Sequence, residues 1–311
     1  MTVKEQSKQV RPARLRELAV SALRIKLRRL CWGLNTKFRR TATVTTKQGV
    51  FTVFLSPNES LGRSLYCYRE HEFDLMSKAM ALLRSIELCP PKGEGTILDV
   101  GASNGVTSIG MLHLGELDRA IAIEPEPRNF VLLRHNVRQN SLNDRVVCLP
   151  AAASNQKGEL PFEVSSTNDG DHRVRTNGNH GVPELFQESV RRVITVQTDN
   201  LCDLLSDVPR KFTQNIAVIW IDVQGYEGYV FLGAMKLLST GIPVVSEIWP
   251  YGIRRSGMSE EQFCRIAEGI WSSYWMMRRG RFVRYPINTL AILFDELGLE
   301  GNSFDNVIFT R

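Results

Sequence analysis

The segment Asp99–Gly105 combines an acidic residue with a turn of small residues, Asp-Val-Gly-Ala-Ser-Asn-Gly, at the end of an apolar run. Glycines at positions 101 and 105 allow the backbone to turn tightly and to approach a ligand closely. A helical pattern follows, and the first N–H groups of a helix have no partners within it. This order of strand, turn and helix is typical of a loop that binds a nucleotide-like cofactor. The loop residues expected to contact the cofactor are Asp99, Gly101, Ala102, Ser103 and Gly105.

A second acidic residue, Glu124, ends the next apolar run, 25 residues after Asp99. In nucleotide-binding α/β folds, an acidic side chain at the end of this strand accepts hydrogen bonds from the ribose hydroxyls of an adenosine. We therefore expect Glu124 to bind a ribose. Pro125, which follows it, and Ala152, at the end of the third apolar run, are expected to line the same site.

The type of cofactor follows from the spacing of the loop. A dinucleotide-binding loop has the pattern G-x-G-x-x-G, whereas this chain has D-x-G-x-x-x-G. Asp99 would repel a pyrophosphate, but it suits a cofactor that carries a sulfonium and an α-amino group. The sequence therefore favours S-adenosylmethionine (SAM) over NAD. The alternative is that Asp99 only caps the helix after it.

Two further carboxylates follow the apolar run Ile216–Val223. Asp222 lies at the carboxyl end of this predicted strand, where open α/β sheets bind their ligands. We expect it to orient an acceptor or to take its proton; the alternative is a structural role in capping the next helix. Glu227 falls in the first turn of that helix, where it either reaches the site or favours the helix dipole.

His172 lies in a polar stretch, Ser165–Gly181, and is the other candidate base because an unperturbed imidazole titrates near neutral pH. A lone histidine in a loop is also commonly just solvated. A metal site needs several ligands at suitable spacing, and Asp222 with Glu227 does not supply them. We therefore predict no metal.

Short buried-strand patterns alternate with helical patterns after residue 95, which indicates an α/β fold with a mainly parallel sheet. A long segment, 154–215, interrupts this alternation and is expected to form a lid. The capping-box pattern of Ser259 and Gln262 predicts a helix start. Arg281–Ile287 and Asn306–Arg311 are expected to pair as closing antiparallel strands. The predicted strands are Thr96–Val100, Ala120–Glu124, Arg145–Ala152, Ile216–Val223 and Pro243–Ile248, and the helices Glu72–Ile86, Val106–Leu114, Pro127–Gln139 and Tyr229–Leu238.

The N-terminal region differs in charge from the rest. Residues 1–40 hold 12 Lys/Arg and 2 Asp/Glu, whereas residues 41–311 hold 27 and 31. Residues 11–40 contain an apolar stripe among basic residues, which suits contact with a membrane or another anionic surface, or docking on the protein itself. Thr43–Leu55 predicts a hairpin, so we divide the chain into an extension, 1–64, and a main domain, 65–311. The stripe consists of Leu15, Leu18, Ala19, Ala22, Leu23, Leu27 and Leu30.

Several classes of protein are disfavoured. The mildly acidic body does not resemble a nucleic-acid-binding domain. No apolar run reaches the ~18 residues of a membrane span, and the N-terminus has no signal-peptide pattern. The six cysteines form no C-x-x-C pair, which indicates reduced thiols in a cytoplasmic protein.

The order of these motifs resembles the FkbM-like family of class I SAM-dependent methyltransferases, over about residues 65–250. The matching segments are Asp99–Gly105, Glu124-Pro125, Asn136, Asn140, Thr198-Asp199, Asp222–Glu227, Gly233-Ala234 and Glu247. Ser103 replaces an asparagine of the family pattern, and Gln224 replaces a glutamate. The second change removes a charge and makes a base or metal role at position 224 doubtful.

The resemblance implies a Rossmann-like fold with a seven-stranded, mainly parallel sheet whose last strand is antiparallel. It also implies O-methylation of a hydroxyl on a saccharide, natural product or glycolipid. Trp249, Pro250 and Tyr251 would then stack on a sugar ring or pack in the core. The alternatives are an RNA or protein methyltransferase that uses the basic arm, and a SAM-binding scaffold without catalysis.

Overall fold

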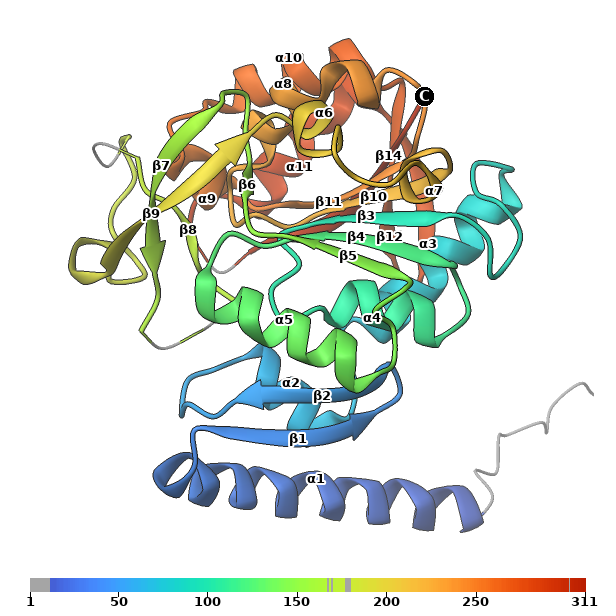
Figure 1. The fold of residues 1–311 in the computed structure, drawn as a ribbon, viewed down its shortest axis with the longest axis vertical. Coiled ribbons are helices and arrows are strands. Elements are labelled where there is room, and N and C mark those ends of the chain that lie inside the picture. Colours follow the sequence, from blue (N-terminus) through green and yellow to red (C-terminus); the bar gives the residue numbers. More distant parts are fainter. Residues whose placement is uncertain (1–11, 167, 169, 177–179, 302) are drawn as a thin grey trace, which may run out of the picture.

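A computed structural model describes residues 12–166, 168, 170–176, 180–301 and 303–311, with the backbone alone over 12–19. Its centre is an eight-stranded sheet in the order β13-β12-β14-β11-β10-β3-β4-β5 (Figure 1). The five strands from β11 to β5 are parallel, and β14 is antiparallel to β11. These strands are β3 Thr96–Val100, β4 Arg119–Ile123, β5 Val146–Leu149, β10 Ile216–Ile221, β11 Val244–Ile248, β12 Ser273–Arg278, β13 Arg281–Pro286 and β14 Asp305–Thr310.

Both faces of this sheet are covered, because alternate residues of the same strands enter two separate cores. Leu98 and Ile219 pack on one side, whereas Ile97 and Val218 pack on the other. Helices α6 Leu201–Leu204, α7 Arg210–Thr213, α8 Glu227–Leu238, α10 Glu260–Ile270 and α11 Leu290–Leu297, the last following the short helix η2 Ile287–Thr289, cover the first side. Helices α3 Phe73–Ser85, α4 Val106–His113 and α5 Pro127–Gln139 cover the second.

The structure confirms the α/β fold, the antiparallel last strand and the capping box at Ser259. Two expectations about the sheet are wrong. It has eight strands instead of seven, and Arg281–Ile287 does not pair with Asn306–Arg311. Strand β12 lies between them and pairs with both β13 and β14. Its sequence, Ser-Tyr-Trp-Met-Met-Arg, is continuously bulky and lacks the alternation of a half-exposed strand.

The long insertion forms a second, four-stranded sheet in the order β6-β9-β7-β8. A buried ion-pair network fixes it: Asp171 pairs with Arg173 and Arg191, and Arg173 also faces Glu188 at 3.7 Å. Tyr251, in α9, donates a hydrogen bond of 2.6 Å to Glu188, which ties the network to the main domain. The elements are β6 Ala152–Ala153, β7 Gly158–Val164, β8 Arg173–Val174, η1 Glu188–Val190, β9 Arg192–Asp199 and, beside them, α9 Pro250–Arg255.

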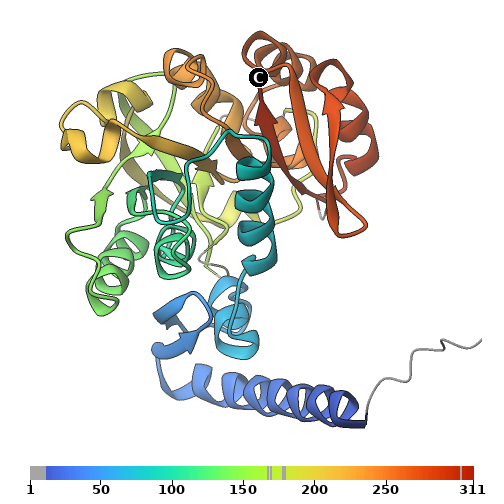
Figure 2. The ribbon, with the colours of Figure 1, turned by 90° about the vertical axis from the view of Figure 1, so that its right-hand side faces the viewer.

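The N-terminal extension consists of α1 Pro12–Phe38, the hairpin β1 Thr41–Thr46 with β2 Gly49–Phe54, and α2 Leu61–Tyr68, a helix that continues past the expected boundary at residue 64. Figures 1 and 2 place α1 at one end of the molecule, with the hairpin and α2 between it and the body. Among the described residues, none of the helices has the length and apolar character needed to cross a bilayer.

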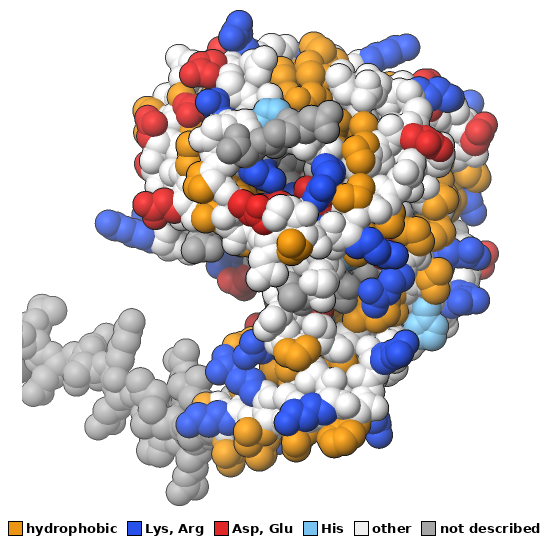
Figure 3. Space-filling view, turned by 90° about the vertical axis from the view of Figure 1, so that its left-hand side faces the viewer, with side chains coloured by type: hydrophobic (Ala, Val, Ile, Leu, Met, Phe, Trp, Pro, Cys, Tyr) orange, Lys and Arg blue, Asp and Glu red, His pale blue; other side chains and the backbone are white. Residues whose placement is uncertain are grey.

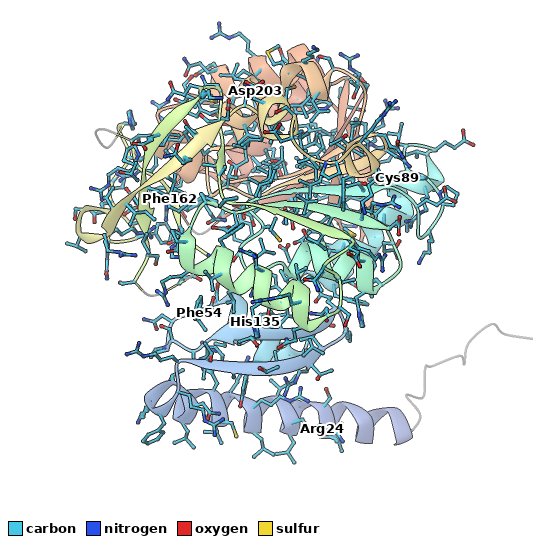
Figure 4. All side chains as sticks on the ribbon, in the orientation of Figure 1. Arg24, Phe54, Cys89, His135, Phe162 and Asp203 are labelled. Carbon is cyan, nitrogen blue, oxygen red and sulfur yellow. The ribbon has the colours of Figure 1, made fainter. Side chains whose placement is uncertain are left out.

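Asparagine side chains in α5 and at its C-terminal cap hold the hairpin to the main domain. Asn136 accepts a hydrogen bond from the Thr52 N–H at 2.8 Å and donates to the Thr52 carbonyl at 3.1 Å. Asn140 makes the same pair of bonds with Val50, at 2.8 and 2.6 Å. His135, labelled in Figure 4, adds a contact of 3.1 Å to the Thr52 hydroxyl. The two asparagines of the family pattern therefore complete the edge of strand β2.

Helix α1 docks on the protein through a different face from its apolar stripe. Among the side chains of this helix that the structure describes, the buried one is Trp32, whose ring meets Tyr66 edge to face at 5.4 Å. Leu23, Leu27 and Leu30 of the predicted stripe are exposed. Ala22 is exposed as well, and the side chains of Leu15, Leu18 and Ala19 lie outside the described residues.

We predict opposite effects for two Gly→Ala changes within helices. A Cβ at Gly233, in α8, would overlap the carbonyl oxygen of Ser154, so Gly233→Ala should destabilise the chain by about 1–3 kcal/mol. A Cβ at Gly269, in α10, meets nothing within 4 Å. Gly269→Ala should therefore leave stability unchanged or raise it by up to about 1 kcal/mol. Urea unfolding of both variants checks this, and equal effects would contradict the described packing.

Candidate active site

A cavity of about 450 Å³ opens at the carboxyl ends of the parallel strands. Strands β4 and β5 follow β3 on one side of it, whereas β10 and β11 lie on its other side, so the order of the strands along the sheet switches between β3 and β10. Ligands of open α/β sheets bind at such a switch point. Figure 3 views the molecule from the side of the insertion and shows a hollow with acidic and basic side chains at its edge. Phe162, on β7 in Figure 4, lines the cavity from the insertion.

The cofactor loop forms one wall. Gly101 has φ of +90°, and a Cβ there would overlap the carbonyl oxygen of Asp222. Ala102 donates its N–H to the Ile123 carbonyl at 2.9 Å, which fixes the loop to the end of β4. Gly105 also has a positive φ and begins α4. The loop therefore adopts the tight turn that its small residues predict. Gly101, Ala102 and Ser103 line the cavity, whereas Gly105 supports the turn from behind.

Asp99 is buried beneath this loop and lines the cavity. Its Oδ2 accepts hydrogen bonds from the N–H of Ser108 at 3.0 Å and from its hydroxyl at 2.6 Å. Burial raises the pKa of Asp99 to about 7 despite these bonds. The capping alternative thus describes part of its role, because Asp99 orders the start of α4 while it faces the cavity.

Glu124 is buried beside the loop, with Pro125 and Ala152 on the same wall. Its Oε2 accepts the N–H of Ser103 at 2.8 Å, and its Oε1 accepts the N–H of Glu126 at 2.8 Å. Burial raises the pKa of Glu124 to about 8. Each carboxylate oxygen can accept a second hydrogen bond. These two bonds therefore position Glu124 and leave it able to accept ribose hydroxyls.

A second set of acidic side chains, Asp222 and Glu247, lies across the cavity, at the ends of β10 and β11. Gln224 donates its side-chain amide to Asp222 at 2.6 Å and to Glu247 at 3.3 Å. Burial and the nearby carboxyl of Glu72 raise the pKa of Asp222 to about 6. Burial and the charge of Asp222 raise the pKa of Glu247 well above its usual range. Gln224 therefore bridges two carboxyl groups that compete for protons.

Glu227 supports this group from below. It is fully buried and is absent from the described residues that line the cavity. Its Oε1 accepts the N–H groups of Val223 and Gly225 at 3.1 and 3.2 Å, so it holds the turn after β10. Burial raises the pKa of Glu227 to about 7. This geometry makes Glu227 a positioning residue and argues against direct contact with an acceptor.

Oxygen atoms of Asp222, Glu227 and Glu247 lie within 4.8 Å of one another, an arrangement that could hold a cation. The prediction of no metal assumed only two of these carboxylates. The third comes from a different strand, β11, and sequence spacing does not reveal it.

His172 lines the cavity and is buried instead of solvated. Its Nδ1 accepts the N–H of Ser165 at 3.0 Å, so the neutral ring carries its proton on Nε2. Burial and the charge of Arg191 lower the pKa of His172 to about 4. A ring whose basic nitrogen is already bonded is a poor general base. The structure therefore disfavours His172 as the base and favours it as a hydrogen-bond donor.

Sequence reasoning missed His71 and Glu72, which line the acceptor side of the cavity from the segment before α3. No motif marks them, because they reach the site through the packing of α3 on the sheet and through the two hydrogen bonds between the Gln48 side chain and the His71 backbone. Trp249 and Tyr251 have different roles: Trp249 lines the cavity, whereas Tyr251 is fully buried. Both rings pack in one buried aromatic cluster, and the guanidinium of Arg173 lies 4.8 Å from the centre of the Trp249 ring, so the core alternative suits both, although Trp249 also reaches the cavity.

Comparison with known proteins finds a protein family that this chain matches. The Methyltransferase FkbM domain matches residues 99–263. The 2-O-methyltransferase NoeI of Sinorhizobium fredii is 28% identical over 170 residues, which are 52% of this chain and 67% of that protein. The structure of methyltransferase FkbM from Methylobacillus flagellatus aligns with a TM-score of 0.44 and 14% identity, over 77% of this chain and 48% of that one. TYW2 of P. horikoshii in complex with MeSAdo aligns with a TM-score of 0.40 and 13% identity, over 87% and 70% of the two chains.

The sheet order and the glycine loop at its switch point define a Rossmann-like, class I methyltransferase fold. The family match narrows this class. The chain belongs to the FkbM methyltransferase family, and it spans about half the length of the FkbM structure from M. flagellatus.

We predict that the buried carboxyl groups make stability depend on pH. Asp99 keeps its proton in the folded chain up to pH about 7, whereas the unfolded chain loses it near its ordinary pKa. Its contribution to the free energy of unfolding therefore falls as pH rises through this window, by about 1.4 kcal/mol per unit. Asp99→Asn should be less destabilising, or more stabilising, at pH 8 than at pH 5. Urea unfolding at both pH values measures this, with exposed Asp207→Asn as the control; a pH-independent effect would contradict it.

Proposed function

We propose that this methyltransferase uses SAM to methylate a hydroxyl group of a saccharide, natural product or glycolipid. The observation that carries the proposal is that one cavity joins the loop Asp99–Gly105 to the carboxyl pair Asp222 and Glu247. The first end has the features of a cofactor site and the second those of an acceptor site.

The cofactor end fits SAM in both shape and charge. The loop lines the cavity with the small residues Gly101, Ala102 and Ser103, and Glu124 faces the cavity where a ribose would lie. The pKa values of Asp99 and Glu124 are raised because the hydrogen bonds to these carboxyls offset only part of the cost of burying a charge, so a cationic or hydrogen-bond-donating ligand would stabilise their ionised forms. When bound, SAM supplies a positive α-amino group and a methyl group activated by a sulfonium. Asp99 would bind the charged end, and Glu124 the ribose.

The acceptor end can remove a proton. Asp222 has a pKa of about 6, so it is ionised at neutral pH and basic enough to accept a proton from a hydroxyl group. The amide of Gln224 fixes the Asp222 carboxylate at 2.6 Å. We assign Asp222 the role of base: the hydroxyl oxygen forms a bond to the methyl carbon, the carbon–sulfur bond breaks, and the hydroxyl proton moves to Asp222.

Aromatic and polar groups together suit a sugar-like acceptor. Trp249, Phe186 and Phe304 line the cavity beside Asn168. Aromatic faces stack on the apolar faces of sugar rings, and the amide can bind ring hydroxyls. The name of the relative NoeI, a 2-O-methyltransferase, supports transfer to oxygen.

We predict that SAM binds and that its affinity depends on both carboxylates. Asp99→Asn and Glu124→Gln should each lower the affinity at pH 8 by about tenfold or more, because each removes a charge-assisted contact. Below about pH 8, the affinity of the wild type should fall as first Glu124 and then Asp99 become protonated, by up to about tenfold per unit for each carboxylate. Calorimetric titration measures these values, with NAD as the negative control.

5′-Methylthioadenosine, which lacks the amino-acid part of SAM, separates the two carboxylates. Its affinity should fall in Glu124→Gln and stay unchanged in Asp99→Asn. Equal loss in both variants would contradict the assigned positions, and wild-type binding of NAD instead of SAM would contradict the cofactor.

We predict that Asp222→Asn lowers kcat by about 10²–10⁴-fold and leaves the affinity for SAM unchanged, because it removes only the base. The rate of the wild type should rise about tenfold per unit up to pH 6 and then level off. Formation of S-adenosylhomocysteine with a panel of pyranosides and glycolipids measures both. Exposed Asp295→Asn is the matched control.

A further experiment, with a chelator, tests whether the three carboxylates bind a metal ion. With Asp222 as a base, EDTA should leave turnover unchanged. Loss of turnover in EDTA and its recovery with Mg²⁺ would assign Asp222, Glu227 and Glu247 to a metal instead.

A further inference from the structure

The outer face of α1 is apolar and exposed. Leu23 is 58% exposed, Leu30 67% and Phe38 82%, values far above those of residues packed in a core. At 3.6 residues per turn, the side chains of the outer stripe fall within an arc of about 80°. The outer stripe consists of Val20, Leu23, Leu27, Leu30, Leu34 and Phe38.

The opposite face of α1 already has its partners. Trp32 packs on Tyr66, and Asn35 donates to the hydroxyl of Tyr66 at 3.1 Å. Arg28 donates to the carbonyl of Cys67 at 3.2 Å. Because these contacts fix the rotation of the helix, the outer stripe cannot turn toward the body without breaking them.

Basic side chains flank the outer stripe on both sides. The 100° turn per residue places Arg24 along one edge, and Lys26 with Lys37 along the other. All three are exposed. Residues 20–40 contain seven Lys/Arg and no Asp/Glu, so nothing on this segment neutralises them. Figure 3 shows apolar side chains along the outer edge of α1, with basic side chains beside them.

We propose that α1 lies flat on the surface of an anionic lipid bilayer. An apolar stripe with basic flanks is the pattern of a helix that inserts its apolar face at the boundary between headgroups and acyl chains. The long stems of Lys and Arg lie along the apolar surface while their charges reach anionic headgroups. The hairpin and α2 separate α1 from the body, so the bilayer meets this helix first (Figure 2).

Charge favours a bilayer over a second copy of the chain. Two copies that met through the outer stripe would bring Arg24, Lys26 and Lys37 of both chains close together, and residues 20–40 offer them no acidic partner. It also favours a bilayer over RNA, because the centre of the exposed face is apolar and the cations lie only at its edges.

The test is flotation of the full chain with vesicles of phosphatidylcholine, alone or with about 30 mol% phosphatidylglycerol. We expect at least tenfold more binding to the anionic vesicles, and a fall of similar size between about 0.1 M and about 1 M salt. Equal binding to both vesicles, or no binding to either, overturns the proposal.

Two sets of variants locate the contact. Leu23→Ser, Leu27→Ser and Leu30→Ser together should abolish flotation and leave the unfolding temperature unchanged, because all three side chains are exposed. The matched control carries the same change at the exposed apolar residues Val131, Val190 and Ile292, and should float like the wild type. If the first variant floats like its control, the proposal fails.

The charge variant covers the case in which the Ser variant does not fold. Arg24→Gln, Lys26→Gln and Lys37→Gln together should remove the preference for anionic vesicles; Arg134→Gln, Arg138→Gln and Lys236→Gln are the exposed control. Sedimentation velocity without vesicles tests the second copy. A dimer that the Leu→Ser changes dissociate, in a protein that does not float, overturns the proposal in favour of self-association.

Discussion

The backbones that follow β3 and β10 lie in direct contact, and this contact fixes the two ends of the cavity relative to each other. The carbonyl oxygen of Asp222 occupies the space that a side chain at Gly101 would need. The same residue donates its N–H to the carbonyl of Val100 at 3.0 Å. Any larger residue at position 101 would push the acceptor-side carboxylate away from the cofactor loop. The distance over which a methyl group would move is therefore set by main-chain packing.

The cavity is unusual in its balance of charge. Asp99, Glu124, Asp222 and Glu247 all face it, and the pKa of each is raised because burial disfavours the ionised form. The arginines of the insertion do not neutralise them, since they pair with carboxylates of their own network. These carboxyl groups therefore hold protons at pH values where exposed carboxyls have lost them. A cationic ligand would favour the ionised carboxylates, so its binding would release protons.

Local pattern predicted the elements of the site well. The strand Thr96–Val100 and the helix Pro127–Gln139 have the predicted bounds, because buried strands and capped helices leave strong signals in the sequence. The pattern failed where the answer depends on contacts between distant segments. Glu247 lies beside Asp222 because β10 pairs with β11, and Glu72 reaches the cavity because α3 packs against the sheet.

The sequence left open whether the apolar stripe of α1 contacts an anionic surface or docks on the protein. The helix docks through Trp32 and Asn35 instead of through the stripe, because these two residues meet a complementary surface on α2. A hydrophobic pattern reports which residues avoid water on average. It does not report which of two faces finds a partner within the same chain.

Asn136 joins two regions that sequence separates widely. Its side chain completes the edge of β2 and also donates to the carbonyl of Asn104 in the cofactor loop, at 2.9 Å. The hydrophobic core on that side is continuous, with Phe51 of the hairpin packed among residues of α4 and α5. The segment that matches the Methyltransferase FkbM domain, residues 99–263, is therefore not a self-contained module. Cutting the chain at residues 99 and 263 would expose one face of the sheet to water and would remove the hairpin that holds Asn136 against the cofactor loop. The folding unit that carries the site therefore includes the hairpin.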